Sequence, residues 1–209
     1  MREIKLINIK KKYNKRIILN NINYTFKEGN IYQIVGSNGC GKTTLLKVIL
    51  GYIKHGGFVE NNFDDYSYIP DKINFPSFLK VGNYIKIIGY TKGLDEETIK
   101  SKSDKLLNLY NMNNAINYKL NQLSKGMKQK VLLICGFLSD VDLYIFDEAL
   151  SGLDKEMQKQ FMNYIKKLKI EKKTIIYTTH YEKYFRGLYD VKITIKDGII
   201  NEKNSKSTS

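Results

Sequence analysis

A glycine-rich stretch of eight residues constrains this chain more than any other part of it. Residues 36–43 read Gly-Ser-Asn-Gly-Cys-Gly-Lys-Thr and satisfy the pattern G-x-x-x-x-G-K-[ST]. Glycines at these positions let successive backbone N–H groups turn towards phosphate oxygens, and the following helix adds the positive end of its dipole. The pattern predicts that Lys42 reaches the β- and γ-phosphates of a nucleotide and that the Thr43 hydroxyl ligates Mg²⁺.

Apolar residues along the chain predict alternating strands and helices, with the phosphate loop between a strand and a helix. Strands are predicted at Arg2–Ile9, Ile22–Phe26, Asn30–Val35, Leu143–Phe146, Thr174–Thr178 and Val191–Lys196, with a Lys- and Asn-rich loop between the first two. Helices are predicted at Lys42–Gly51, Val81–Tyr90, Glu96–Leu109, Ser124–Leu138 and Lys155–Ile170. This order predicts an α/β fold with a mainly parallel core sheet and a helical lobe near residues 77–138. We expect one domain over residues 1–209, with a frayed tail at Asn201–Ser209.

The composition says more about the cellular compartment of the chain than about its binding partner. The net charge is +14, and a basic field suits nucleotides, a membrane surface or nucleic acid equally, so charge alone does not choose between them. The two cysteines share no short spacing, which excludes a disulfide framework or a Cys-based zinc site and suits a reducing cytosol. No apolar run reaches the roughly 20 residues of a spanning helix, and Met1–Lys12 does not have the pattern of a secretory signal. We therefore expect a soluble chain that works at a membrane only through another chain.

Two consecutive acids follow the buried strand Leu143–Phe146, and they are candidates for metal and water chemistry. Asp147 would hold the Mg²⁺ shell, and Glu148 would polarise the attacking water. His180 follows another predicted strand, where a side chain lies beside the phosphate site of an α/β sheet. The alternatives are two exposed acids at a strand end and a structural histidine.

Leu123-Ser124-Lys125-Gly126-Met127 precedes a predicted helix. Ser124 is suited to cap that helix, and this alone would explain the motif. The functional alternative is a second glycine-containing helix start that binds the γ-phosphate of a nucleotide held by another subunit.

The motifs together, in this order and at these spacings, resemble the nucleotide-binding subunit of ATP-binding cassette (ABC) transporters over nearly the whole chain. Gly36–Thr43 is similar to the Walker A loop, Leu143–Glu148 to the Walker B strand with its catalytic Glu, and Leu123–Met127 to the LSGGQ signature. Ser151–Asp154 resembles the D-loop, and His180 the switch histidine. Tyr13 lies where the family has an aromatic ring that stacks on adenine.

The resemblance implies a P-loop NTPase core with a mainly parallel sheet, an antiparallel β subdomain and a helical subdomain. It implies catalytic roles for Glu148, His180 and Lys42 and metal-binding roles for Thr43, Asp147 and Asp71. It implies nucleotide-binding roles for Tyr13, Gly36, Ser37, Asn38, Gly39, Cys40, Gly41, Lys42, Thr43, Thr44, Asp71, Ser124, Lys125, Gly126, Met127 and Asp154.

The resemblance also implies a Mg²⁺-dependent ATPase that uses ATP and Mg²⁺ to power a separate transmembrane permease. A second ATP-binding subunit would complete a head-to-tail dimer, and the chain would lie on the cytoplasmic face of the cell membrane through the permease. The apolar residues Phe75, Phe78, Val81 and Tyr84, near the segment Asp71–Ile88, either pack the helical lobe or form the permease-docking surface.

Three positions depart from the family pattern. Lys125 replaces the first glycine of the signature and Met127 its glutamine, variants that resemble those of transporters with separate ATPase and permease chains. Asp71 replaces a glutamine that couples the metal site to the helical lobe. The separate permease and the signature with Lys125 and Met127 favour an exporter or self-protection transporter. The alternative is a soluble ABC ATPase acting on nucleic acid or ribosomes, but such relatives usually carry two cassettes or long coiled coils, so we do not expect a nucleic-acid partner.

Overall fold

The computed structural model describes residues 1–72, 74–180, 185 and 187–204. Its strands are β1 (Glu3–Tyr13), β2 (Arg16–Lys27), β3 (Ile31–Val35), β4 (Gly56–Asn61), β5 (Ser67–Ile69), β6 (Leu143–Asp147), β7 (Thr174–Thr178), β8 (Val191–Lys196) and β9 (Ile199–Asn204). Its helices are α1 (Lys42–Ile49), α2 (Val81–Thr91), α3 (Glu96–Leu109), α4 (Lys125–Gly136) and α5 (Lys155–Ile170), with 3₁₀ turns at Asn113–Ala115 and Leu120–Gln122.

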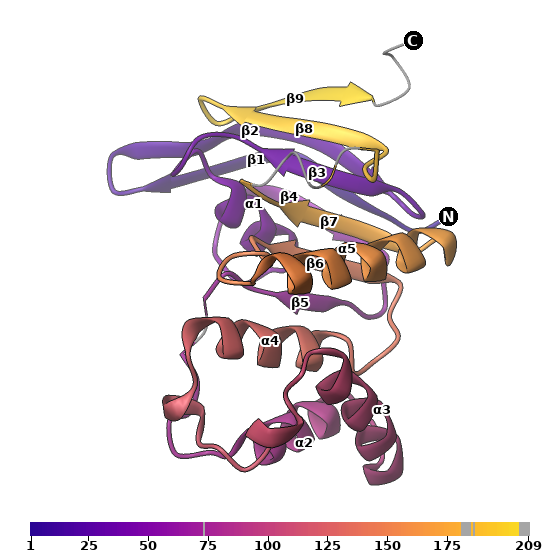
Figure 1. The fold of residues 1–209 in the computed structure, drawn as a ribbon. Helices are drawn as coiled ribbons and strands as arrows, with labels where there is room; N and C mark the ends of the chain where they lie inside the picture. Colours follow the sequence, from indigo (N-terminus) through magenta and orange to yellow (C-terminus); the bar gives the residue numbers. More distant parts are fainter. Residues whose placement is uncertain (73, 181–184, 186, 205–209) are drawn as a thin grey trace.

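The strands form two sheets, and in Figure 1 the larger one runs from β9 at the top to β5 below. The core sheet has the order β5-β6-β7-β3-β8-β9; its first five strands are parallel, and β9 pairs antiparallel with β8. The smaller sheet has the order β2-β1-β4 and is antiparallel. The predicted α/β class, with a parallel core and an antiparallel subdomain, is confirmed.

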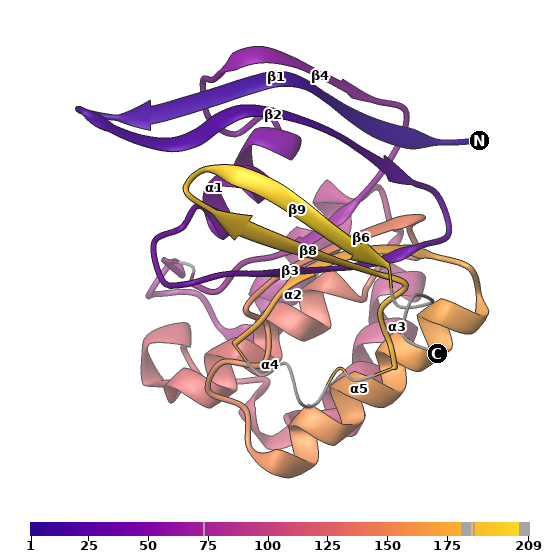
Figure 2. The ribbon, with the colours of Figure 1, turned by 90° about the horizontal axis from the view of Figure 1, so that it is seen from above.

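The central strands β3, β6 and β7 are mostly apolar and buried along their whole length, because both faces of the sheet are covered there. All five residues of β6 are buried. Leu143 and Ile145 belong to the cluster that includes α1 and the antiparallel sheet, whereas Tyr144 and Phe146 belong to the cluster that includes α4 and α5. Figure 2 shows α1 on one side of the core sheet and α5 on the other.

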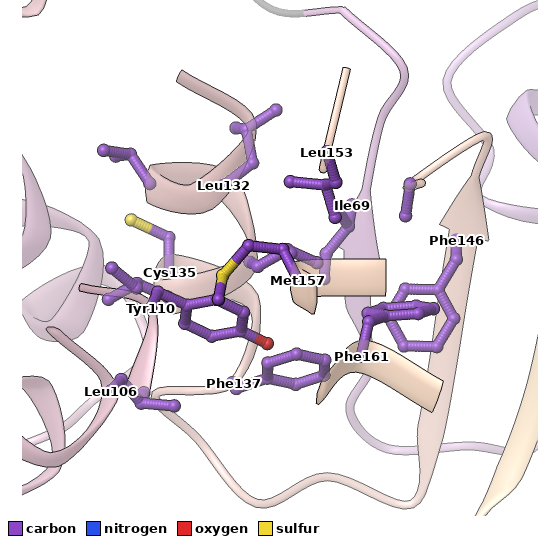
Figure 3. Close-up of a cluster of buried hydrophobic side chains, with 14 of the residues drawn as sticks. Ile69, Leu106, Tyr110, Leu132, Cys135, Phe137, Phe146, Leu153, Met157 and Phe161 are labelled. Atoms are coloured by element: carbon purple, nitrogen blue, oxygen red, sulfur yellow. The ribbon is translucent and has the colours of Figure 1, made fainter. Parts of the chain in front are cut away.

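Aromatic rings fill the space between β6, α4 and α5. The ring of Phe137, which follows α4, lies 5.9 Å from Phe146 and 4.0 Å from Tyr164, and Phe161 lies edge-on 5.1 Å from Phe146. Figure 3 shows Phe137, Phe146 and Phe161 with Tyr110 and Met157 in this cluster. Rings packed at such distances in T-shaped or tilted geometry stabilise a core beyond their buried area. The cluster therefore joins the helical lobe to the core sheet.

The helices α2, α3 and α4 lie together next to β5 (Figure 1). Asp95 caps α3 by accepting a hydrogen bond from the backbone N–H of Thr98. At the C-terminal end of α4, the Ser67 hydroxyl donates to the Gly136 carbonyl over 2.6 Å. The last turn of α4 is therefore bound to the edge of the core sheet. Among the helices of the described residues, none has the length and hydropathy needed to span a membrane.

The structure corrects three predictions about the strands. The stretch predicted as a Lys- and Asn-rich loop is the distal half of a hairpin, in which β1 reaches Tyr13 and β2 begins at Arg16. Asn14, with φ of 52°, supplies the left-handed turn. The strands β4 and β5 were not predicted, because β5 has three residues and β4 is largely exposed.

The tail is the third correction. Residues 201–204 continue β9, with Asn201 opposite Thr194 and Glu202 opposite Ile193, so the predicted fraying is wrong for them. Residues 205–209 lie outside the described residues. The tail strand is polar, and its order comes from backbone hydrogen bonds to β8 rather than from an apolar pattern.

Candidate nucleotide site

Three neighbouring parallel strands, β6, β7 and β3, end at one edge of the core sheet. Their register places Asp147 opposite Thr178, and Thr178 opposite Ile34. The glycine-rich loop follows β3, Glu148 follows β6, and His180 follows β7. Ligands of open α/β sheets bind at this carboxyl edge. The residues predicted from three separate parts of the sequence are therefore brought together here.

The glycine-rich loop needs its glycines for steric reasons. A Cβ on Gly36 would lie 2.6 Å from the Ile195 carbonyl oxygen, and Gly36 has φ of 152°. Gly41 caps α1 with φ of 113° and has Ile18 and Leu19 of β2 against it. A residue with a side chain does not fit at these two positions. The side chain would collide with neighbouring atoms, and the positive φ disfavours every residue except glycine.

Lys42 is buried, with 6% of its surface exposed. Its ammonium donates to the carbonyl oxygens of Gly36 over 3.0 Å and Ser37 over 3.3 Å. The outer part of the loop is accessible, since Ser37, Asn38 and Gly39 are exposed, and Cys40 and Thr44 are half-buried. The outer residues of the loop therefore face solvent, and the buried Lys42 ammonium stabilises the loop through its hydrogen bonds to two loop carbonyls.

A pocket of about 390 Å³ brings together all three predicted metal-binding residues. It is lined by Thr43, Lys47, Tyr68, Pro70, Asp71, Lys72 and Asp147. The described residues contain no group of three or more His, Cys, Asp or Glu able to hold a metal ion alone. One hydroxyl and two carboxylates are nevertheless a set that fits Mg²⁺, which is usually held by one or two carboxylates together with substrate phosphates.

Asp147 is almost fully buried, and the Thr178 hydroxyl donates to its Oδ1 over 2.7 Å. On the wall of the same pocket, burial raises the pKa of Tyr68, and the carboxylates of Asp147 and Asp71 act in the same direction. Its hydroxyl therefore stays protonated at neutral pH. The hydrogen bond from Thr178 fixes the orientation of the buried Asp147 carboxylate.

Glu148 and His180 face each other beside this pocket. Glu148 Oε1 lies 2.7 Å from His180 Nε2, with side-chain exposures of 25% and 42%. The backbone of Glu148 has φ of 52°, and its N–H donates to the Thr178 carbonyl and hydroxyl oxygens. A solvent-accessible carboxylate that contacts an imidazole at a strand end can take a proton from water.

The signature-like segment starts α4, as its capping residue predicts. The Ser124 hydroxyl accepts a hydrogen bond from the Met127 N–H over 3.2 Å. A Cβ on Gly126 would lie 2.8 Å from the Gly152 carbonyl oxygen, and the Lys125 ammonium donates to the Ser151 hydroxyl over 3.4 Å. The segment therefore lies against residues 151–152 of its own chain.

Asp154, the last residue of the D-loop-like segment, caps α5 by accepting from the Met157 N–H over 2.9 Å. Tyr13 is 46% exposed near the tip of the β1–β2 hairpin, where the Lys11 ammonium lies 4.8 Å from its ring centroid. Figures 1 and 2 both show this hairpin tip on the same side of the molecule as the N-terminal end of α1.

Two residues that hold the site were not predicted. Thr178 bonds both Asp147 and Glu148, and the only sequence signal for it is a hydroxyl at the end of an apolar strand. Gln129, on α4, is buried and donates from Nε2 to the Ala149 carbonyl over 3.1 Å. Nothing in the sequence distinguishes this glutamine from an exposed one.

Comparison with known proteins shows the family of the chain. A sequence model of the ABC transporter family matches residues 19–151. The uncharacterized ABC transporter ATP-binding protein MJ1023 of Methanocaldococcus jannaschii is 34% identical over 94% of this chain and 75% of its own length. The lantibiotic transport ATP-binding protein SrtF of Streptococcus pyogenes is 31% identical over 85% of this chain and 80% of its own.

Among solved structures, the dimeric structure of MJ0796, a bacterial ABC transporter cassette, has a TM-score of 0.85 at 26% identity. It covers 96% of this chain and 98% of that one. A structure described as the ATP-binding subunit of an ABC transporter has a TM-score of 0.88 at 22% identity, over 97% and 90% of the two chains, and shows the shared fold. The family match covers more than half of the chain, and the chain belongs to the ABC transporter family as one of its ATP-binding subunits.

Proposed function

We propose that this chain hydrolyses ATP with Mg²⁺ and that the cycle powers a separate membrane permease. The observation that carries the proposal is the meeting of three strand ends at one edge: the Lys42 loop, the Asp147 pocket and the Glu148–His180 pair. Each supplies a different requirement of phosphoryl transfer: phosphate binding, metal binding and activation of water.

The phosphate contacts follow from the loop. The backbone N–H groups of residues 37–43 and the Lys42 ammonium bind the phosphate oxygens, because the loop surrounds the N-terminal end of α1. Thr43, Asp147 and Asp71 would hold the metal in their shared pocket. When bound, Mg²⁺ neutralises the charge that develops on the phosphate oxygens.

The water chemistry follows from the Glu148–His180 pair. The Glu148 carboxylate orients the attacking water and takes its proton. His180 orients the Glu148 carboxylate through their 2.7 Å contact and places a hydrogen-bond donor near the γ-phosphate. Tyr13, an exposed ring near the hairpin tip, would stack on the adenine.

The dimer is the second part of the proposal. The exposed loop residues Ser37 to Gly39 do not enclose a γ-phosphate on their own. In a head-to-tail dimer, the start of α4 at Ser124–Met127 would cover the nucleotide held by the other subunit, with Asp154 near the contact. The dimeric cassette structure of a relative at 26% identity supports a dimer.

The permease would dock between the core and the helical lobe. A groove of about 540 Å³ lies there, with Tyr52, Tyr66, Tyr84, Ile88 and Leu132 in its walls. Of the apolar residues predicted near this place, Val81 is fully buried, and Phe75 packs on Tyr84 at 5.2 Å between ring centroids. These pack the lobe. Phe78 is 74% exposed and remains the candidate for contact with the apolar face of a permease helix.

The most specific part of the proposal is that the chain serves an exporter or self-protection transporter. It is supported by the lantibiotic transport relative and by the variant signature with Lys125 and Met127. Through the permease, the chain would lie on the cytoplasmic face of the membrane.

Glu148→Gln tests the chemistry, with Glu97→Gln on the exposed face of α3 as the matched control. The Glu148 variant should bind ATP with unchanged affinity, hydrolyse it at least about 100-fold more slowly, and accumulate an ATP-dependent dimer in analytical ultracentrifugation. Unchanged turnover in Glu148→Gln would contradict the catalytic assignment.

The permease is tested by purifying the chain from detergent-solubilised membranes of its own cells and identifying bound proteins by mass spectrometry. A polytopic membrane protein in stoichiometric amount is the expected partner. Recovery of ribosomal proteins or nucleic acid without a membrane protein would overturn the permease assignment while leaving the ATP site unaffected.

A further inference from the structure

A buried amide on α4 contacts the backbone directly after Glu148. Gln129 is 4% exposed, and its Nε2 donates to the carbonyl oxygen of Ala149 over 3.1 Å. The next turn of the helix, Val131 to Ile134, is buried and apolar. A polar side chain in such surroundings destabilises the fold unless it is hydrogen-bonded, so this bond determines where the amide lies.

The backbone of Glu148 is held on both of its sides. On the N-terminal side of its Cα, the Glu148 N–H donates to Thr178 of β7, to the carbonyl over 3.2 Å and to the hydroxyl over 3.0 Å. On the C-terminal side, the carbonyl of the next residue, Ala149, accepts a hydrogen bond from Gln129. With φ of 52°, Glu148 has a left-handed backbone conformation that non-glycine residues rarely adopt and that persists only where the surroundings impose it.

These two contacts come from different parts of the fold. Thr178 belongs to the core sheet, whereas Gln129 belongs to α4, on which α2 and α3 pack. Figure 1 shows α4 between β5 and the other two helices of the lobe. A displacement of α4 therefore changes the contact on one side of Glu148 and leaves the contact on the other side in place.

We propose that Gln129 is a positioning residue for Glu148: through the Ala149 carbonyl it fixes the direction of the Glu148 carboxylate and makes that direction follow the position of α4. The inference rests on the proposed function, in which Glu148 activates water. It adds that the helical lobe, where the permease groove lies, acts on the hydrolysis step through one buried amide.

Gln129→Met tests the proposal on the full chain, because methionine keeps the length and helix propensity of glutamine and removes the donor. Gln129→Asn, which keeps the amide on a side chain one methylene shorter, is the second variant. The control is Gln158→Met on α5, since Gln158 is also buried, at 7% exposure, and its Nε2 donates to the Leu153 carbonyl over 3.0 Å. Thermal unfolding of all three variants separates effects on the site from loss of fold.

Gln129→Met and Gln129→Asn should lower kcat for ATP about tenfold, the factor that 1.36 kcal/mol represents. The dissociation constant for ATP should change by less than about twofold, because the phosphate loop is untouched. Gln158→Met should keep the wild-type kcat. An equal loss of kcat in the Gln158 control, or a loss of ATP affinity that matches the loss of kcat, would overturn the inference.

A double variant makes the test specific for Glu148. In single-turnover measurements, Gln129→Met should lower the rate in the wild-type chain and leave the residual rate of Glu148→Gln unchanged, because the carboxylate through which it acts is gone. The same tenfold loss in both backgrounds would overturn the inference. Absence of ATP turnover in the wild-type chain would instead contradict the proposed function, so the two failures are distinguishable.

Discussion

The hydroxyl of Thr178 donates to Oδ1 of Asp147 over 2.7 Å, and it does so across two neighbouring parallel strands. The same oxygen accepts the N–H of Glu148. One hydroxyl thus orients the proposed metal-binding carboxylate and the backbone of the proposed base. Thr178 brings no charge to Asp147, so a metal ion held there would meet the full charge of the carboxylate.

Thr178→Val should weaken the metal site while leaving the sheet intact. Loss of a partner that orients a metal ligand typically costs 10–100-fold in affinity or activity, and the Mg²⁺ concentration for half-maximal ATPase should rise by about this factor. Thr174→Val is the matched control, because Thr174 lies fully buried at the other end of β7 and its hydroxyl accepts from the Gly29 N–H. Equal Mg²⁺ dependence in the two variants would show that the hydroxyl of Thr178 has no special role.

Gly126→Ala should separate the start of α4 from residues 151–152. The new Cβ would lie 2.8 Å from the Gly152 carbonyl oxygen, so one of the two backbones must move. Alanine favours a helix by about 1 kcal/mol and overpacking costs about 1–3 kcal/mol, so unfolding should change little while ATPase falls. Gly82→Ala is the control: Gly82 is also the second residue of its helix, but the Cβ meets mainly the side chain of Ile116. ATPase that falls equally in both variants would contradict this prediction.

Acid should remove stability that comes from the start of β6. Hydrogen bonds from Arg2 and Lys173 lower the pKa of Asp142 in the folded protein below its ordinary value of about 3.9. Because the folded pKa is the lower one, the contribution is fully present above about pH 4 and is lost as pH falls through the folded value. Asp142→Asn should therefore lower the melting temperature at pH 6 and have a smaller effect at pH 3.

The control for the acid prediction is Asp104→Asn on the exposed face of α3, and thermal unfolding by circular dichroism is the measurement. A difference between wild type and Asp142→Asn that stays constant from pH 6 to pH 3 would mean that the ion pairs with Arg2 and Lys173 contribute nothing to stability.

The order of strands and helices around the site could be predicted because β6 and β7 are mostly apolar, are buried along their whole length and lead directly into polar functional residues. Asp147, Glu148 and His180 were predicted in this way, as residues after strands of one sheet. The structure brings them to one edge together with the Lys42 loop.

The parts that could not be predicted have no local pattern. The distal half of the β1–β2 hairpin carries exposed Lys and Asn side chains, and strand β9 is polar, so only pairing with a neighbour makes them strands. Gln129 is similar: its position in the sequence is that of any polar residue on a helix, and its role depends on the Ala149 carbonyl, 20 residues away in the chain.

The ammonium of Lys42 gives the glycine loop its shape from inside, through the carbonyl oxygens of two of the loop's own residues. The conformational entropy of this segment is therefore lost during folding of the chain rather than at each encounter with a ligand. Nucleotide capture should then exchange the two hydrogen bonds of Lys42 and displace water, with little change in the loop backbone. The association rate should depend on diffusion and charge more than on rearrangement of the backbone.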